Sequence, residues 1–169
     1  MKWLAGLLPL FALVLVSCQK SEVVSEFTGN EMVYALQPGS SYAVSGTITF
    51  KERKDGSTTA VIALTGTDGN AKHPVHVHLG DIAVTGADVA ALLSPVEASS
   101  GRSETVLTRL ADDTRVSYQD VLKLSACIKI HQSDTGPGRD VILAAGNIGQ
   151  SYVRSMAGGR FSVGLCESE

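Results

Sequence analysis

Histidine is the residue type in this chain whose spacing points most directly to chemistry. Three of the four histidines lie in one heptapeptide, residues 73–79, and the fourth is His131. Successive side chains of an extended strand point to opposite faces, so His76 and His78 share one face and the valines beside them take the other. The same alternation separates His131 from the isoleucines that precede it. His76, His78 and His131 therefore each face away from the apolar side of their own strand.

Three imidazoles arranged in this way suggest a metal site. Imidazole nitrogen suits copper, zinc, iron and nickel, and three such ligands with an open fourth position describe a reactive centre rather than a closed structural one. If the strands that carry His76, His78 and His131 are neighbours, the three rings converge. The alternative is a chance grouping of surface histidines. No cysteine joins the histidines at the spacing of a zinc finger.

The remaining polar residues around the histidines have simpler interpretations. His73 precedes a proline that interrupts the strand, and we expect it to be a solvent-exposed turn residue; the alternative is a fourth metal ligand. Lys129 is expected to be a solvated or edge-protecting lysine on the outer side of its strand; the alternative is a lysine that attracts anions to His131. Asp81 follows the histidine strand directly and is either a turn residue or an acceptor that orients an imidazole.

The N-terminus has the pattern of an export signal. A lysine follows the first methionine, and residues 3–16 form an apolar run of about 14 residues without a charge. A membrane span needs roughly 20 residues, so the run is short for one. It ends in LVSC at Cys18, which resembles the lipobox of bacterial lipoproteins. The resemblance implies that residues 1–17 are a signal peptide and that Cys18 is lipidated; the alternative is an ordinary signal peptide with an incidental cysteine.

A lipid on Cys18 would anchor the protein to a membrane without spanning it. Gln19 stands where lipoproteins retained at the inner membrane carry Asp, so we expect the cell envelope, at the outer membrane, facing the periplasm or the cell surface. Residues 18–41 are mostly polar and are expected to be a lipidated tether, with one domain over residues 42–169. The net charge of −3, without basic blocks, makes nucleic acid a poor candidate partner.

Two cysteines remain beyond the export segment, Cys127 and Cys166. In an oxidising compartment we expect them to form a disulfide, with two free thiols as the alternative. The disulfide would tie the C-terminus to a central strand.

The rest of the chain has mainly strand patterns. Residues 42–50 and 58–64 alternate apolar and polar side chains, and the Asp55-Gly56 turn between them predicts a hairpin. Ser117 and Asp120 have the spacing of a capping box, which predicts a short helix over residues 117–124. Seven or eight short strands separated by turns indicate an all-β sandwich or barrel. The other expected strands are residues 73–79, 105–110, 127–131, 141–145 and 161–165.

Two segments resemble the Cu/Zn superoxide dismutases. Residues 75–81, VHVHLGD, are similar to the Phe-His-Val-His segment of that family, and residues 129–149 are similar to its last copper histidine and closing Gly-x-Ile-Gly strand. The resemblance implies a Greek-key, immunoglobulin-like β-sandwich in which His76, His78 and His131 bind copper. It also implies one-electron chemistry on superoxide.

The chain departs from that family at several positions. No histidine occurs between His78 and His131, so the family's bridging and zinc-binding histidines are absent and no zinc site is expected. The arginine that guides superoxide in the family aligns with Ile142, while Arg139 is close but out of register. These departures leave it open whether the chain is an enzyme.

The same stretch also resembles the CHRD domain. His76-Val-His78-Leu-Gly80, followed by the expected helix and by the strand that ends at His131, has the order of motifs found there. This resemblance implies a β-sandwich that serves as a non-catalytic binding or structural module of the cell envelope. The sequence therefore supports two hypotheses: a membrane-anchored copper-binding domain that acts on superoxide, and a CHRD-like module without catalysis.

Overall fold

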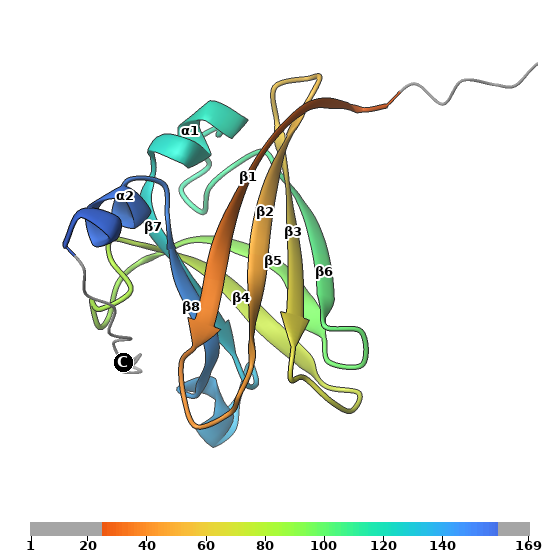
Figure 1. Cartoon of the computed structure of the whole chain (residues 1–169), viewed down its shortest axis with the longest axis vertical. Helices are drawn as coiled ribbons and strands as arrows, with labels where there is room; N and C mark the ends of the chain where they lie inside the picture. Colours follow the sequence, from red (N-terminus) through yellow and green to blue (C-terminus); the bar gives the residue numbers. More distant parts are fainter. Residues whose placement is uncertain (1–24, 159–169) are drawn as a thin grey trace, which may run out of the picture.

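A computed structural model describes residues 25–158, which form eight β-strands, two α-helices and one 3-10 helix (Figure 1). The all-β class and the short helix predicted from the sequence are confirmed. The elements in chain order are β1 (Phe27–Pro38), β2 (Ser45–Arg53), β3 (Thr58–Thr65), β4 (Lys72–Leu79), β5 (Val89–Glu97), β6 (Arg102–Leu107), α1 (Tyr118–Lys123), β7 (Ser125–His131), η1 (Gly136–Arg139), β8 (Ile142–Ile148) and α2 (Gly149–Gly158).

The strands form one antiparallel sheet that closes into a barrel in the order β1-β2-β3-β6-β5-β4-β7-β8. Three neighbouring pairs, β3–β6, β4–β7 and β8–β1, join strands that are not consecutive in the chain. Two pairs of neighbouring strands share few paired residues: β1 pairs with β8 at two positions, and the consecutive strands β5 and β6 pair at one. The barrel therefore consists of two four-stranded halves, β1-β2-β3-β6 and β5-β4-β7-β8, held together along two narrow seams.

The interior of the barrel is filled by the apolar side of each alternating strand. In β2, Ile48 and Phe50 are fully buried, as the alternation in the sequence predicts. Each buried aliphatic or aromatic side chain stabilises the fold by about 1.5–3 kcal/mol relative to exposure. The other large core residues include Tyr34, Leu36, Ile62, Val75, Val77, Ile128, Ile130 and Ile148.

Helices α1 and α2 lie together at one end of the barrel (Figure 1). The predicted capping box of α1 is present: the Ser117 hydroxyl accepts from the backbone N–H of Asp120, and the Asp120 carboxylate accepts from the backbone N–H of Ser117. Helix α2 begins at Gly149, whose φ of 54° favours glycine. A Cβ at this position would overlap the carbonyl oxygen of Leu124.

The expected tether, residues 18–41, contains part of the barrel, and this boundary of the prediction is wrong. Strand β1 (Phe27–Pro38) pairs with β2 over most of its length and closes the sheet against β8. The segment looks polar because, of its twelve residues, only Tyr34 and Leu36 are buried. The sequence also missed β5 and α2, and the expected strand at 105–110 begins earlier, as β6. Residues 1–17, Cys18, the expected strand 161–165 and Cys166 lie outside the described residues.

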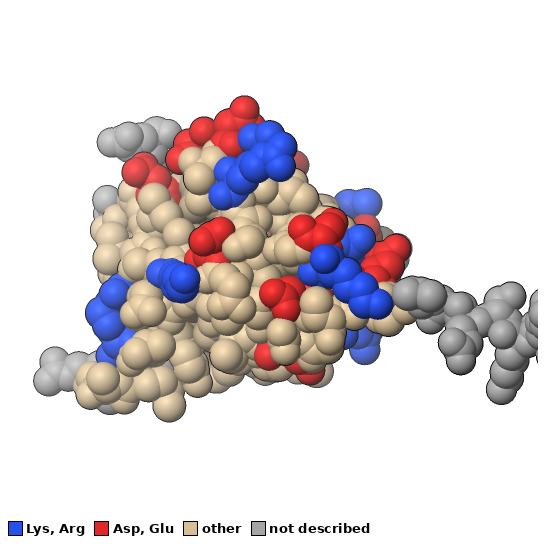
Figure 2. Space-filling view, turned by 90° about the horizontal axis from the view of Figure 1, so that it is seen from above, with Lys and Arg blue, Asp and Glu red and all other residues tan. Residues whose placement is uncertain are grey.

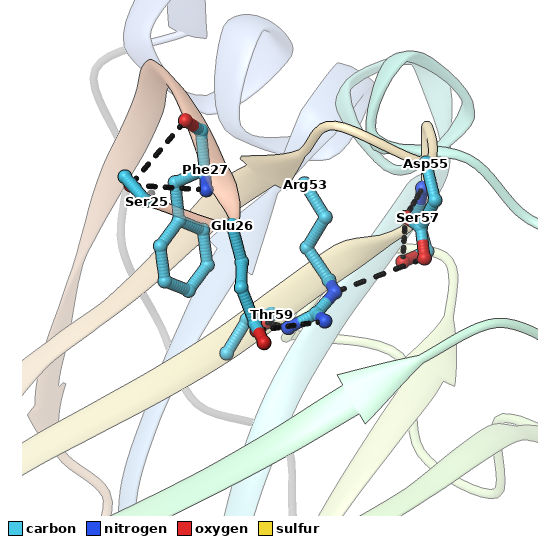
Figure 3. A network of polar contacts seen from close by, with 7 residues as sticks. All are labelled: Ser25, Glu26, Phe27, Arg53, Asp55, Ser57 and Thr59. Carbon is cyan, nitrogen blue, oxygen red and sulfur yellow. Dashed lines mark hydrogen bonds and ion pairs between the residues drawn. The ribbon is translucent and has the colours of Figure 1, made fainter. Parts of the chain in front are cut away.

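Polar contacts fasten the start of β1 to the β2–β3 hairpin (Figure 3). The Arg53 guanidinium forms an ion pair with Glu26 at 2.9 Å and lies 3.9 Å from the Asp55 carboxylate. The Asp55 carboxylate in turn accepts from the backbone N–H and the hydroxyl of Ser57, which shapes the hairpin turn. The N-terminal strand is thus held at both of its ends.

Acidic and basic side chains are interspersed over the face of the molecule shown in Figure 2, and neither sign forms a continuous patch there. Within residues 25–158 there is no helix that combines the length and the apolar character needed to cross a membrane.

Candidate metal centre

The strands that carry the histidines, β4 and β7, are neighbours in the barrel. Their antiparallel register places His76 opposite Lys129 and His78 opposite Cys127. His131 follows at the end of β7, two residues beyond Lys129 and so diagonal to His76. Since directly opposed residues share a face of the sheet, all three histidines lie on the outer side, while the valines and isoleucines between them fill the barrel. The predicted faces of both strands are confirmed.

The three predicted ligands come together in one cluster. One ring nitrogen from each of His76, His78 and His131 lies within 4.8 Å of the other two. The ring centroids are 4.6 Å apart for His76 and His131, 5.7 Å for His76 and His78, and 6.2 Å for His78 and His131. Metal–nitrogen bonds of about 2.1 Å hold two donors at most about 4.2 Å apart, so small side-chain adjustments bring all three nitrogens within bonding distance of one ion.

Main-chain carbonyls hold two of the rings in one tautomer. The Nδ1–H of His78 donates to the carbonyl oxygen of Ala87 at 2.7 Å, and the Nδ1–H of His131 donates to that of Arg139 at 2.6 Å. Because a carbonyl oxygen only accepts, the proton must be on Nδ1, and in the neutral ring the Nε2 atom carries a lone pair. This is the arrangement in which a second group orients a metal-binding imidazole.

The two Nε2 atoms are unusual among buried polar groups. Both are inaccessible to solvent, and neither has a hydrogen-bond partner within the described part of the chain. Buried polar atoms in proteins are nearly always satisfied, so each exception requires an explanation. A cation that accepts both lone pairs supplies one, and the three histidines therefore fit a bound metal.

Burial keeps the three imidazoles neutral. Desolvation, and after it electrostatic interaction with His131, His78 and Arg139, lower the pKa of His76 from 6.5 to about 4. Desolvation is also the largest cause of the lowered pKa values of His78 and His131, although their bonds to Ala87 and Arg139 act in the opposite direction. Neutral imidazole is the form that binds metals, so the site is ready to bind at neutral pH without losing protons.

The outer face of β4 and β7 is covered by the loops that follow them, residues 80–88 and 132–141. Ile82 of the first loop packs with Cys127, Ile142 and Ala145 in a small apolar cluster on this side of the sheet. The loop thus buries part of the outer face of the sheet, and the histidine cluster lies beneath this cover.

This cover overturns the expectation for Lys129. The side chain is outward on its strand as predicted, but it is 0% exposed, and its Nζ donates to the carbonyl oxygen of Val84 at 3.4 Å. Strand periodicity gives the face of the sheet that a residue occupies, not whether a loop lies over that face. Its charge also contributes to the lowered pKa values of His78 and His131.

The expectation for His73 is also wrong. His73 is buried within β4, where its Nδ1 lies 3.0 Å from the carbonyl oxygen of Gln132, and it is not part of the cluster. Pro74 does not end the strand; β4 accommodates it with a shift in its register with β5 between His73 and Val75.

Asp81 is a turn residue rather than an imidazole partner. Its carboxylate accepts from the backbone N–H of Ala83 at 2.9 Å and from the side-chain amide of Asn147 at 2.8 Å. Asn147 also accepts from the backbone N–H of Ile82 at 2.8 Å. Asn147 therefore holds the 80–88 loop against β8. It was not singled out from the sequence, although a polar side chain within the apolar run of residues 142–148 is a signal that would have marked it.

A groove of about 460 Å³ opens beside one member of the cluster. His76 forms part of its wall, whereas His78 and His131 are buried away from it. The cluster is thus enclosed on the side of two ligands and open on the side of the third. Comparison of the chain with protein-family models, with curated proteins and with solved structures finds no match.

Proposed function

We propose that this chain is a membrane-anchored, extracytoplasmic copper-binding domain of superoxide dismutase-like fold that acts on superoxide. His76, His78 and His131 would hold the metal, the latter two through Nε2. The observation that carries the proposal is the pair of buried Nε2 lone pairs, each fixed by a carbonyl on the far side of its ring and each without a hydrogen-bond partner among the described residues.

The donor set favours copper. The cluster offers three neutral imidazoles and neither a carboxylate nor a thiolate from the described residues. Nitrogen sites of this kind bind Cu(II) more strongly than the other divalent first-row metals. Three protein ligands leave a coordination position open, and bound copper would supply one-electron chemistry through its two oxidation states.

The chain's own residues would do the remaining work around the metal. The loops exclude water from two ligands and hold their rings, and burial keeps all three rings unprotonated. The charge of Arg139, which lies close enough to lower the pKa of His76, would attract an anion such as superoxide. The two barrel halves and the return of β7 beside β4 support the expected Greek-key sandwich.

Membrane attachment through Cys18 is the second part of the proposal, and it is supported by the order of apolar run, small residue and cysteine. A Cys18→Ser chain expressed in a bacterial host should move from the membrane fraction to the soluble fraction. Wild-type and variant chains with the same distribution would contradict the anchor.

A copper titration tests the metal site. Purified protein should bind about one equivalent, and the His76→Ala/His131→Ala variant should lose tight binding by at least a hundredfold, because two of three ligands are gone. His73→Ala is the matched control: it removes a buried histidine of β4 outside the cluster and should leave copper binding intact. Equal binding by the double variant and wild type would refute the site.

The alternative function is a CHRD-like binding or structural module of the envelope without catalysis. The absence of any histidine between His78 and His131 in the sequence favours it, since the family's bridging ligand is lost. A superoxide assay on copper-loaded protein distinguishes the two hypotheses. Copper-dependent dismutation that disappears in the double variant supports the enzyme, and copper retention without dismutation supports the module.

A further inference from the structure

The groove beside His76 has the character of a ligand-binding site. Its floor is formed by β4 around Pro74 and His76, and one wall by Leu92 and Pro95 of β5. Leu92 lies directly opposite His76 in the β4–β5 pairing and is 68% exposed, so its apolar side chain is accessible to a ligand in the groove. The volume, about 460 Å³, is within the range typical of small-molecule sites.

The cluster is asymmetric with respect to this groove. Carbonyl bonds fix the rings of His78 and His131, and both side chains are buried. His76 is half-buried, has no such hydrogen bond among the described residues and is the one member of the cluster in the groove wall. An external molecule therefore reaches the cluster along the His76 side, and its donor atom would complete the coordination from there.

One wall of the groove offers apolar contact to a ligand. The Leu92 and Pro95 side chains offer apolar contact along the wall. Lys72, at the rim, is already paired with Glu97 at 2.9 Å, so its charge is compensated.

The geometry points to a second binding site in this groove, for a small molecule that has an apolar part and one donor atom for the metal beside His76. The inference rests on the proposed copper site and adds a ligand class to it. The apolar part of the ligand lies against Leu92 and Pro95, and its donor atom takes the open coordination position.

Two probes that share one donor group separate coordination from groove contact. Imidazole offers the nitrogen alone, and 4-phenylimidazole adds an apolar ring that the groove would bury. Spectroscopic titration of the copper-loaded full chain should give 4-phenylimidazole a Kd about tenfold lower than that of imidazole, because burial of apolar area adds to the same coordinate bond.

A pair of strand variants tests where the extra affinity arises. Leu92→Ser should reduce the preference for 4-phenylimidazole to within about twofold while the Kd of imidazole stays unchanged. Val106→Ser is the control, since Val106 is also an exposed strand residue but does not line the groove, and it should keep the full preference.

The outcomes distinguish the two proposals. Equal Kd values for both probes in the wild type, or an unchanged preference in Leu92→Ser, would overturn the groove site while leaving the copper site intact. Failure of the wild-type chain to retain copper, seen before any probe is added, would overturn both.

Discussion

Burial of His78 and His131 with ring nitrogens that have no hydrogen-bond partner among the described residues is costly for the metal-free protein. At the scale of the residue, His76, His78 and His131 are each less basic in the folded chain than in water, chiefly because burial disfavours their charged forms. The desolvation cost therefore arises at three side chains within one cluster. Groups whose pKa values are shifted in this way concentrate at functional sites.

A pH dependence of stability follows from the same shifts. Between pH 6.5 and about 4 the unfolded chain protonates these histidines while the folded chain keeps His76 neutral, so the unfolded state binds more protons. Stability therefore rises with pH through this window and is lost as pH falls from 6.5 toward 4. Urea unfolding of the metal-free protein at pH 7, 5.5 and 4.5 measures the effect.

The control for this experiment replaces the three histidines by asparagine, which does not titrate. The slope between pH 6.5 and 4 should shrink strongly in that variant. The carboxylates with lowered pKa values, Asp55, Asp112 and Asp120, differ in proton binding between the two states mainly near and below their usual pKa of 3.8, so they contribute little over most of this window. A metal-free protein whose stability is flat or rises as the pH falls through this window would contradict the shifts.

The sequence predicted the outward faces of the three histidines at this scale because strand periodicity determines which side chains share a face. It could not show that β4 and β7 are adjacent, since pairing of distant strands depends on the whole fold; that expectation came from the resemblances. Lys129 and His73 were misjudged for a related reason. Their burial is produced by loops and by a shift of register, which are properties of the three-dimensional path rather than of local spacing.

At the scale of the element, the capping box of α1 is a local motif that the sequence identified correctly. Ser117→Ala removes the hydroxyl that accepts from the Asp120 backbone and should lower the free energy of unfolding by about 1 kcal/mol. Ser99→Ala, at an exposed turn position, should change it by less than about 0.5 kcal/mol. Chemical denaturation compares the two, and equal values would argue that the cap contributes nothing.

The elements that the sequence missed share a weak pattern. Strand β1 has two buried residues in twelve and so lacks a clear alternation. Strand β5 contains Pro95 and two adjacent alanines, which depress its strand propensity. Helix α2 begins with glycine and contains serines, so neither its propensity nor its mixed apolar face marks it. In all three, contacts with distant segments outweigh the local preference.

At the scale of the whole molecule, barrel closure depends on the narrow β1–β8 seam. Gly146 of β8 lies there, and a Cβ at this position would overlap the carbonyl oxygen of Ala35 on β1. Gly146→Ala should lower the free energy of unfolding by about 1–3 kcal/mol, because the strands must separate to admit the methyl group. Thermal or urea unfolding measures it.

Gly158→Ala is the matched control, since no atom lies within 4 Å of a Cβ built at Gly158. That substitution should change stability by no more than about 0.5 kcal/mol. If Gly146→Ala were equally mild, the close approach of β1 and β8 would not be what closes the barrel.

The carbonyl groups that hold His78 and His131 belong to the main chain, and this determines how the site tolerates mutation. Any residue type at positions 87 and 139 presents the same acceptor, so substitutions there leave the rings held as before. A deletion or insertion of one residue in loop 80–88 or 132–141, in contrast, moves the acceptor away from its imidazole. For the holding of the two rings, evolutionary change would accordingly be unrestricted in residue identity at these two positions and restricted in loop length.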